Sequence, residues 1–208
     1  MNSTALTAYL IDDDRAVLHS VSELLDAAGI PTLAFISAEQ FLHQLTPATA
    51  GCIITDLRMQ GMSGADLLRV LRDAGCKLPV IVVSGHADVP VTVDVMEHGA
   101  ITLLQKPYKA DELLEAVERA LDIYRNDHQR TEQLDDIRRR LDSLQPDEYG
   151  VMKLMIHGKP NKAIASELEI SMRTVDRRRS AVLEKMGVAS APEVARLVAL
   201  LEAAEIPA

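Results

Sequence analysis

Five side chains suited to phosphate chemistry are spread along the first half of the chain. They are three carboxylates, a hydroxyl and an ammonium: Asp12, Asp13, Asp56, Ser84 and Lys106. Asp56 directly follows the apolar run 52–55 and precedes a turn, so a buried strand would carry this carboxylate to its exposed tip. These groups could hold a divalent cation and accept a phosphoryl group if the fold brings them together.

Short apolar runs alternate with helical periods around these residues. The strand candidates are residues 8–11, 32–36, 52–55, 79–83 and 101–104, and the helix candidates are residues 14–28, 37–45, 64–74, 88–98 and 109 onward. This alternation is typical of a parallel sheet covered by helices on both faces. The strands are rich in Ile, Val and Leu without strict alternation, which fits burial on both sides. We therefore expect a doubly wound, flavodoxin-like α/β domain with a five-stranded parallel sheet.

The carboxyl ends of the strands are the expected place of function in such a fold. Asp12 and Asp13 follow the first strand, Asp56 the third, Ser84 the fourth and Lys106 the fifth. Crowded carboxylates repel one another unless a cation joins them, and hard oxygen ligands suit Mg²⁺. The sequence therefore predicts a Mg²⁺ site beside a nucleophilic Asp56. Lys106 and Ser84 would neutralise the oxygens of an incoming phosphoryl group.

Four segments carry a family resemblance: "YLIDDD", "CIITDLRMQGMSG", "VIVVSG" and "LLQKPY". In this order and spacing they resemble the receiver domain of two-component response regulators, over about residues 5–122. The resemblance implies that a sensor histidine kinase phosphorylates Asp56. It also implies that Mg²⁺ is held by Asp12, Asp13, Asp56 and the main-chain carbonyl of Arg58. Lys106 would contact the phosphoryl group and precede a cis bond to Pro107.

The residues of the family's conformational switch are Ser84 and Leu103. Ser84 fits the pattern, whereas Leu103 stands where the family commonly has an aromatic ring. Without a ring to rotate inward, activation would depend on Ser84 and on main-chain movement around the fourth helix. The alternative is a degenerate pocket that is not phosphorylated, which the presence of all five polar groups makes less favoured.

Charge divides the chain into two parts. The formal net charge is −9, and the excess of acids lies in residues 1–145, because residues 146–208 are balanced. Within the balanced part, the segment 171–186 has more basic than acidic residues. This local positive charge could meet phosphates.

The segment "KPNKAIASELEISMRTVDRRRSAVLEKMGV" predicts a helix, a turn and a second helix. Asn161 would cap a helix through Leu168, and Ser171 or Met172 would open the next one. An exposed basic helix after a short turn is the geometry that enters the major groove of DNA. The alternative is a solvated charged face of a helical bundle.

Over about residues 144–204 this part resembles the LuxR-type helix-turn-helix, so the whole chain resembles the FixJ/NarL class of response regulators. The resemblance implies contacts with double-stranded DNA. The positions expected to read bases are Asp176, Arg177 and Ser180. The positions expected to contact phosphates are Lys162, Arg173, Thr174, Arg178 and Arg179. Two departures are "LQPDEYGVM" in place of the usual opening of the first helix, and Arg178 where a histidine is frequent.

We expect three parts: a receiver domain at residues 1–122, a helical linker at 123–143 and a small all-α DNA-binding domain at 144–208. The chain has neither Gly nor Pro between Asp111 and Gln145, so one helix could cover about 30 residues. Two apolar stripes leave alternatives open. One stripe predicts either a short coiled coil between protomers or packing on the next domain: Leu134, Ile137, Leu141 and Leu144. The other predicts either dimerisation or cover for its own small core: Val194, Leu197, Val198 and Leu201.

Composition narrows the possible functions. No apolar run is long enough for a membrane helix and no signal peptide is visible, so we expect a cytoplasmic protein. The chain has no Trp, two Phe and four Tyr, which argues against base stacking on aromatic rings. The predicted function is a response regulator transcription factor that dimerises and binds DNA when phosphorylated, and is no enzyme beyond its own phosphotransfer and autodephosphorylation. The alternatives are a phosphorelay or protein-interaction module and, less favoured, a Mg²⁺-dependent hydrolase.

Overall fold

The computed structural model describes residues 6–85 and 89–205. The chain divides into two compact units, residues 1–127 and 128–208, which meet within one helix. The strands of the first unit are β1 (Thr7–Ile11), β2 (Thr32–Phe35), β3 (Gly51–Asp56), β4 (Val80–Ser84) and β5 (Ala100–Gln105). Its helices are α1 (Arg15–Ala27), α2 (Ala38–Gln44), α3 (Gly64–Asp73), α4 (Val89–Glu97) and the first part of α5 (Ala110–Asp142).

All five strands are parallel and lie in the order β2-β1-β3-β4-β5. The expected doubly wound α/β fold is confirmed. The single helix expected from Asp111 onward is also present, because α5 runs through 33 residues. Asp88, expected at the start of the fourth helix, lies outside the described residues.

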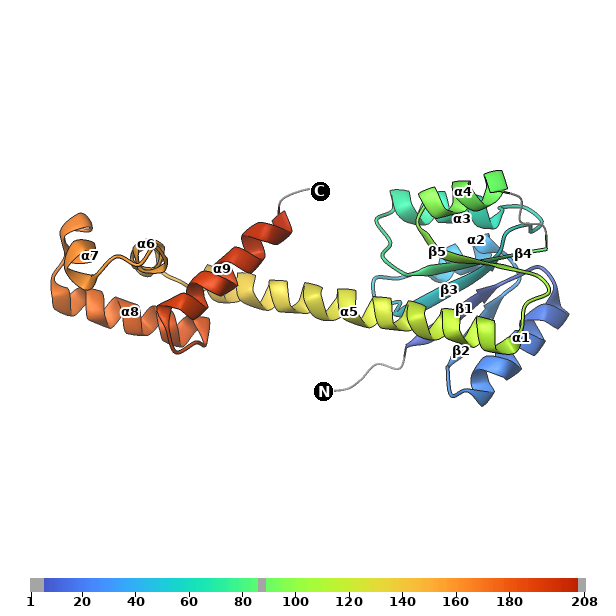
Figure 1. Cartoon of the computed structure of the whole chain (residues 1–208), viewed down its shortest axis with the longest axis horizontal. Helices are drawn as coiled ribbons and strands as arrows, with labels where there is room; N and C mark the ends of the chain where they lie inside the picture. The colour runs from blue at the N-terminus through green and yellow to red at the C-terminus, as the bar shows by residue number, and fades with distance from the viewer. Residues whose placement is uncertain (1–5, 86–88, 206–208) are drawn as a thin grey trace. The chain divides into compact units, whose positions relative to one another are not determined.

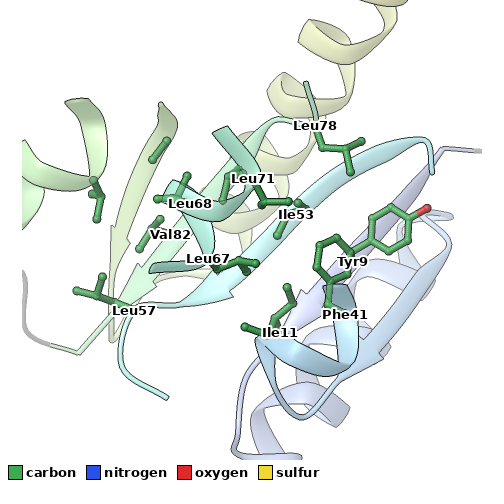
Figure 2. Close-up of a cluster of buried hydrophobic side chains, with 14 of the residues drawn as sticks. Tyr9, Ile11, Phe41, Ile53, Leu57, Leu67, Leu68, Leu71, Leu78 and Val82 are labelled. Atoms are coloured by element: carbon green, nitrogen blue, oxygen red, sulfur yellow. The ribbon is translucent and has the colours of Figure 1, made fainter. Parts of the chain in front are cut away.

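Alternate residues of the central strands supply two apolar cores, one on each face of the sheet. Tyr9, Ile53 and Val82 pack with α2 and α3 in one core, and Figure 2 shows them beside Phe41 and Leu67. The residues between them face α1 and α5, and include Leu10, Ile54 and Ile81. Figure 1 shows the two helical layers. Burial on both faces explains why these strands are apolar without alternation.

The second unit is helical and consists of the rest of α5 with α6 (Pro146–Ile156), α7 (Asn161–Glu167), α8 (Met172–Met186) and α9 (Ala191–Glu205). Its core includes the apolar residues at the end of α5: Leu134, Ile137, Leu141 and Leu144. It also includes the stripe of α9: Val194, Leu197, Val198 and Leu201. Of the alternatives above, packing within this unit is therefore the one that the structure favours for both stripes.

Of the helix starts in this unit, one is capped as expected, one is capped despite its unusual sequence and one differs from the expectation. Ser171 caps α8 as expected, since its hydroxyl accepts a hydrogen bond from the Thr174 amide at 3.1 Å. The unusual opening of α6 is capped by Glu148, whose carboxylate accepts from the Gln145 amide at 2.8 Å. The expected cap at Asn161 is wrong. Pro160 occupies the cap position of α7. Asn161 is the first helical residue, and its side-chain amide donates a hydrogen bond to Asp176 of α8.

Gly150 lies inside α6 and offers a stability test of this unit. A Cβ there would meet only Leu168, at 3.9 and 4.0 Å, which is ordinary contact. We expect Gly150→Ala to raise the free energy of unfolding by up to about 1 kcal/mol, because alanine loses less backbone entropy in a helix. Thermal unfolding followed by calorimetry would measure the change, and a lower melting temperature would contradict the packing at this position.

Candidate phosphorylation pocket and nucleic-acid interface

The sheet brings four of the predicted residues to one edge. Ile11 of β1 pairs with Thr55 of β3, so Asp12, directly after β1, lies beside Asp56, the last residue of β3. Ser84 pairs with Gln105, and Lys106 is the next residue. The peptide bond from Lys106 to Pro107 is cis, as the resemblance implied.

Lys106 is the centre of this pocket. Its ammonium Nζ donates to Asp56 Oδ1 at 2.6 Å and to Asp12 Oδ2 at 3.0 Å. Burial by itself would lower the pKa of the ammonium, but the hydrogen bonds with the two carboxylates outweigh burial and hold that pKa above its usual value. Only 9% of the Asp12 side chain and 11% of the Asp56 side chain are exposed, so solvent screens these interactions weakly.

Main-chain amides fix the second oxygen of each buried carboxylate. Asp12 Oδ1 accepts from the Asp14 amide at 2.8 Å, and Asp56 Oδ2 accepts from the Arg58 amide at 2.7 Å. These amides carry no sequence signature, and sequence reasoning missed them. They hold the carboxylates of the strand tips in one orientation.

Asp13 is oriented differently. Its Oδ2 accepts from the main-chain amide of Gln60 at 2.9 Å, and its side chain is exposed. Among residues 6–85 and 89–205, no three His, Cys, Asp or Glu side chains are gathered closely enough to hold a metal ion. The donor set is nevertheless the hard oxygen chemistry that Mg²⁺ requires, and Asp12, Asp13 and Asp56 come from two neighbouring strand tips.

The two predicted switch residues lie on neighbouring strands. Ser84 is buried at the tip of β4, and its main-chain carbonyl accepts from the Lys106 amide at 2.8 Å. Leu103 is half-buried in β5 and packs against the core below α2 and α3. Leu103, an aliphatic residue, therefore occupies the position at which the family commonly has an aromatic ring.

The predicted DNA-binding residues lie on α7 and α8, and their surroundings separate them into two groups. Three side chains are exposed, with no hydrogen bond or ion pair to the described part of the chain: Lys162, Arg173 and Arg177. The others have partners or are half-buried. Arg178 forms an ion pair with Asp147 of α6, and only 19% of its side chain is exposed. Arg179 is half-buried.

The remaining polar residues of α8 are engaged locally. The Thr174 hydroxyl lies 2.8 Å from that of Ser171, and Ser180 donates to the Asp176 carbonyl at 3.1 Å. Asp176 is exposed, and its carboxylate accepts from Asn161. Of the positions expected to read bases, Arg177 is therefore the one whose side chain is unengaged.

Two hydrogen bonds hold the C-terminal end of α8 within the second unit. Lys185 Nζ donates to Glu148 Oε2 at 2.6 Å. This bond, more than the cap from the Gln145 amide, lowers the pKa of the Glu148 carboxyl. Arg140 Nη1 donates to the Met186 carbonyl at 2.8 Å. These contacts and the buried side chains of Val175, Val182 and Met186 hold α8 with its basic side outward.

Within the described residues, no helix is both long and apolar enough to cross a membrane. Cys52 is buried in the core beside α1 and α5, and burial raises the pKa of its thiol to about 12. This cysteine is therefore a small core residue, as its apolar surroundings in the sequence indicated.

Both domains of the chain match known protein families. Residues 8–118 match the family described as the response regulator receiver domain, and residues 142–198 match the bacterial regulatory proteins of the luxR family. Response regulator protein TodT of Pseudomonas putida is 35% identical over 97% of this chain and 89% of its own. Transcriptional regulatory protein FixJ of Rhizobium meliloti is 38% identical over 93% of this chain and 95% of its own.

Two solved structures extend the comparison. The response regulator StyR covers 94% of this chain and 99% of its own, with 35% identity and a TM-score of 0.89. Full-length FixJ from B. japonicum covers 97% of this chain and 99% of its own, with 36% identity and a TM-score of 0.60. The chain belongs to the two-component response regulators that join a receiver domain to a LuxR-type DNA-binding domain.

Proposed function

We propose that Asp56 accepts a phosphoryl group from a sensor histidine kinase and that this modification controls dimerisation and sequence-specific DNA binding. The observation that carries the proposal is the position of Lys106, whose ammonium bridges the carboxylates of Asp56 and Asp12. A half-buried cation between two strand-tip carboxylates neutralises charge where phosphoryl transfer would concentrate it.

The transfer itself needs little covalent chemistry from the protein. An oxygen of Asp56 attacks phosphorus, the new O–P bond forms, and the N–P bond to the kinase histidine breaks so that the electron pair stays on the imidazole. Lys106 then pairs with a phosphoryl oxygen instead of the Asp56 carboxylate. Ser84, buried at the tip of the neighbouring strand β4, would donate its hydroxyl hydrogen to another phosphoryl oxygen.

Receiver domains typically use Mg²⁺ for this reaction. Here the cation would be held by the carboxylates of Asp12, Asp13 and Asp56 and the main-chain carbonyl of Arg58, and it would neutralise charge on the phosphoryl oxygens. The Gln60 amide occupies only Oδ2 of Asp13, so its other carboxylate oxygen would be the one to hold the cation.

The response must be a shift between two conformations. Phosphorylation shifts the equilibrium only by the difference between the interaction free energies of the phosphoryl group with the two conformations. A full switch needs a difference of about a few kcal/mol. Because Leu103 offers no ring, the shift would depend on Ser84 and on main-chain movement around α4. The two domain boundaries that fit this proposal are near residues 122 and 144, with the C-terminal part of α5 between them.

Intact-protein mass spectrometry tests the phosphorylation. Incubation with acetyl phosphate and Mg²⁺ should add the mass of one phosphoryl group, and reduction of the acyl phosphate with borohydride should place it on Asp56. Modification at another residue, or none in the presence of Mg²⁺, would refute the proposal.

Substitutions of arginines on α8 test the proposed DNA interface. We expect Arg177→Ala to weaken binding to a specific duplex by about 1–3 kcal/mol, because a bidentate arginine–guanine contact contributes that much. Arg173→Ala should weaken all duplexes about equally and reduce the dependence of affinity on salt.

Fluorescence anisotropy over a range of salt concentrations would measure both effects. Arg119→Ala, which removes a charge from α5 in the receiver unit, is the matched control and should leave DNA affinity unchanged. A C-terminal domain that binds a protein instead would show no salt-dependent affinity for DNA.

A further inference from the structure

Asn161 and Asp176 form a contact between the two helices of the helix-turn-helix. The amide Nδ2 of Asn161, at the start of α7, donates to Asp176 Oδ1, in the second turn of α8, at 2.5 Å. Asp176 is exposed on the side of α8 that carries Arg173 and Arg177. An acid on this basic surface repels phosphates, so its presence calls for an explanation other than affinity.

The carboxylate is oriented by a neutral donor. Arg173, Arg177 and Arg179 all lie within one turn of Asp176 on α8, yet no ion pair joins any of them to it in the described chain. Asn161 therefore occupies one oxygen of Asp176 without cancelling its charge. The second oxygen has no hydrogen-bond partner in the described residues, and a side chain fixed in this way loses less entropy when it binds.

We propose that Asn161 is a positioning residue that holds Asp176 so that its second oxygen accepts a hydrogen bond from the N4 amino group of a cytosine in the major groove. This inference rests on the proposed DNA-binding function. Asn161 itself need not touch DNA.

Cytosine is the base that suits an acceptor best. Its major-groove edge offers the N4 amino donor and no acceptor, whereas guanine offers two acceptors, N7 and O6, which repel a carboxylate. Adenine has an N6 donor next to the N7 acceptor, and thymine has the O4 acceptor and a methyl group. Because Asp176 also repels the phosphate backbone, its contribution is discrimination between bases more than affinity.

The experiment begins with selection of duplexes from a random library by the full-length wild-type protein, and all proteins are treated with Mg²⁺ and beryllofluoride, a mimic of the phosphoryl group. Binding is then measured for the selected duplex and for single base-pair changes, with wild type, Asp176→Ala, Asn161→Ala and the double variant. We expect one cytosine that wild type prefers by about tenfold over other bases. Asp176→Ala and Asn161→Ala should both reduce that preference to less than about threefold, and the double variant should lose no more than either. A 2-pyrimidinone at that position, which lacks the amino group, should reduce wild-type affinity by about the same factor.

Two further variants separate positioning from a general structural role. Asn161→Asp keeps the size of the side chain but replaces the donor with a like charge, so it should lose the same preference. Lys162→Ala, the next residue of α7, should instead weaken all duplexes equally and reduce the salt dependence. Thermal unfolding of each variant confirms that the domain is folded.

The outcomes are distinct. A cytosine preference that survives in Asn161→Ala, or an equal loss of affinity for every duplex in that variant, would overturn the positioning role. Loss of preference in Asp176→Ala alone would do the same. If wild type treated with Mg²⁺ and beryllofluoride shows no salt-dependent DNA binding, the proposed function fails before the inference is reached.

Discussion

Replacing Asp56 with asparagine is expected to abolish the response of the protein to beryllofluoride, a mimic of the phosphoryl group. With Mg²⁺ and beryllofluoride, wild type should sediment as a dimer or with a changed shape, and Asp56→Asn should sediment as the untreated protein. The amide keeps the size of the carboxylate but lacks the anionic oxygen that forms the bond. Analytical ultracentrifugation at several protein concentrations would separate dimerisation from a change of shape.

Asp73→Asn is the matched control for this change. Asp73 is exposed at the end of α3, and the substitution removes the same charge from the same unit. It should respond as wild type does, and the response of both should disappear without Mg²⁺. A response that persists in Asp56→Asn would contradict Asp56 as the phosphorylation site. No response in any of the three proteins would mean that Leu103 marks a receiver uncoupled from phosphorylation.

The strand tips of the receiver unit were predictable because their position depends only on local signals. An apolar run followed by a polar residue locates Asp12, Asp56, Ser84 and Lys106, and parallel strands necessarily bring their carboxyl ends to one edge. The sequence could not show the orientation of Asp13. Its partner is the amide of Gln60, which any residue could supply and which is 47 residues away in the chain.

In the second unit, too, local features could be predicted from the sequence and contacts between distant residues could not. The helix-turn-helix and the cap at Ser171 follow local rules, whereas Asn161 satisfies the rule for a helix cap and yet lies one residue inside the helix. Its contact with Asp176 spans 15 residues, and the ion pair between Arg178 and Asp147 spans 31. Such contacts depend on how two helices cross, which the spacing of residues within one helix does not specify.

Gly64→Ala is expected to destabilise the receiver unit by about 1–3 kcal/mol, the usual cost of extra volume in a packed site. Gly64 is the first residue of α3, and its amide donates to the Leu57 carbonyl at 3.1 Å. A Cβ there would lie 2.3 Å from the carbonyl oxygen of Asp56 and 3.1 Å from the Asp56 carbonyl carbon. Both are backbone atoms, so no side-chain rotation relieves the clash, and either α3 or the tip of β3 must move.

The clash matters for function if the tip of β3 is the part that moves, because that tip carries Asp56. A shift of the strand tip would lengthen the hydrogen bond between Asp56 and Lys106, now 2.6 Å, and misplace the oxygen that we propose attacks phosphorus. A misplacement of about 1 Å can slow a reaction by about 10²-fold, so phosphorylation by acetyl phosphate should be slowed by at least tenfold in this variant. Calorimetry and the rate of phosphoryl incorporation measure the two effects.

Gly150→Ala is the control, because it makes the same chemical change in the other unit. It should raise the melting temperature of its own transition, and phosphoryl incorporation should proceed at the wild-type rate. If Gly64→Ala leaves both stability and rate unchanged, the close packing of α3 on Asp56 is wrong. If it lowers stability but leaves the rate unchanged, α3 has moved and the strand tip has not. A loss of both would mean that the absence of a side chain at Gly64 is needed to keep Asp56 in the position proposed for phosphorylation.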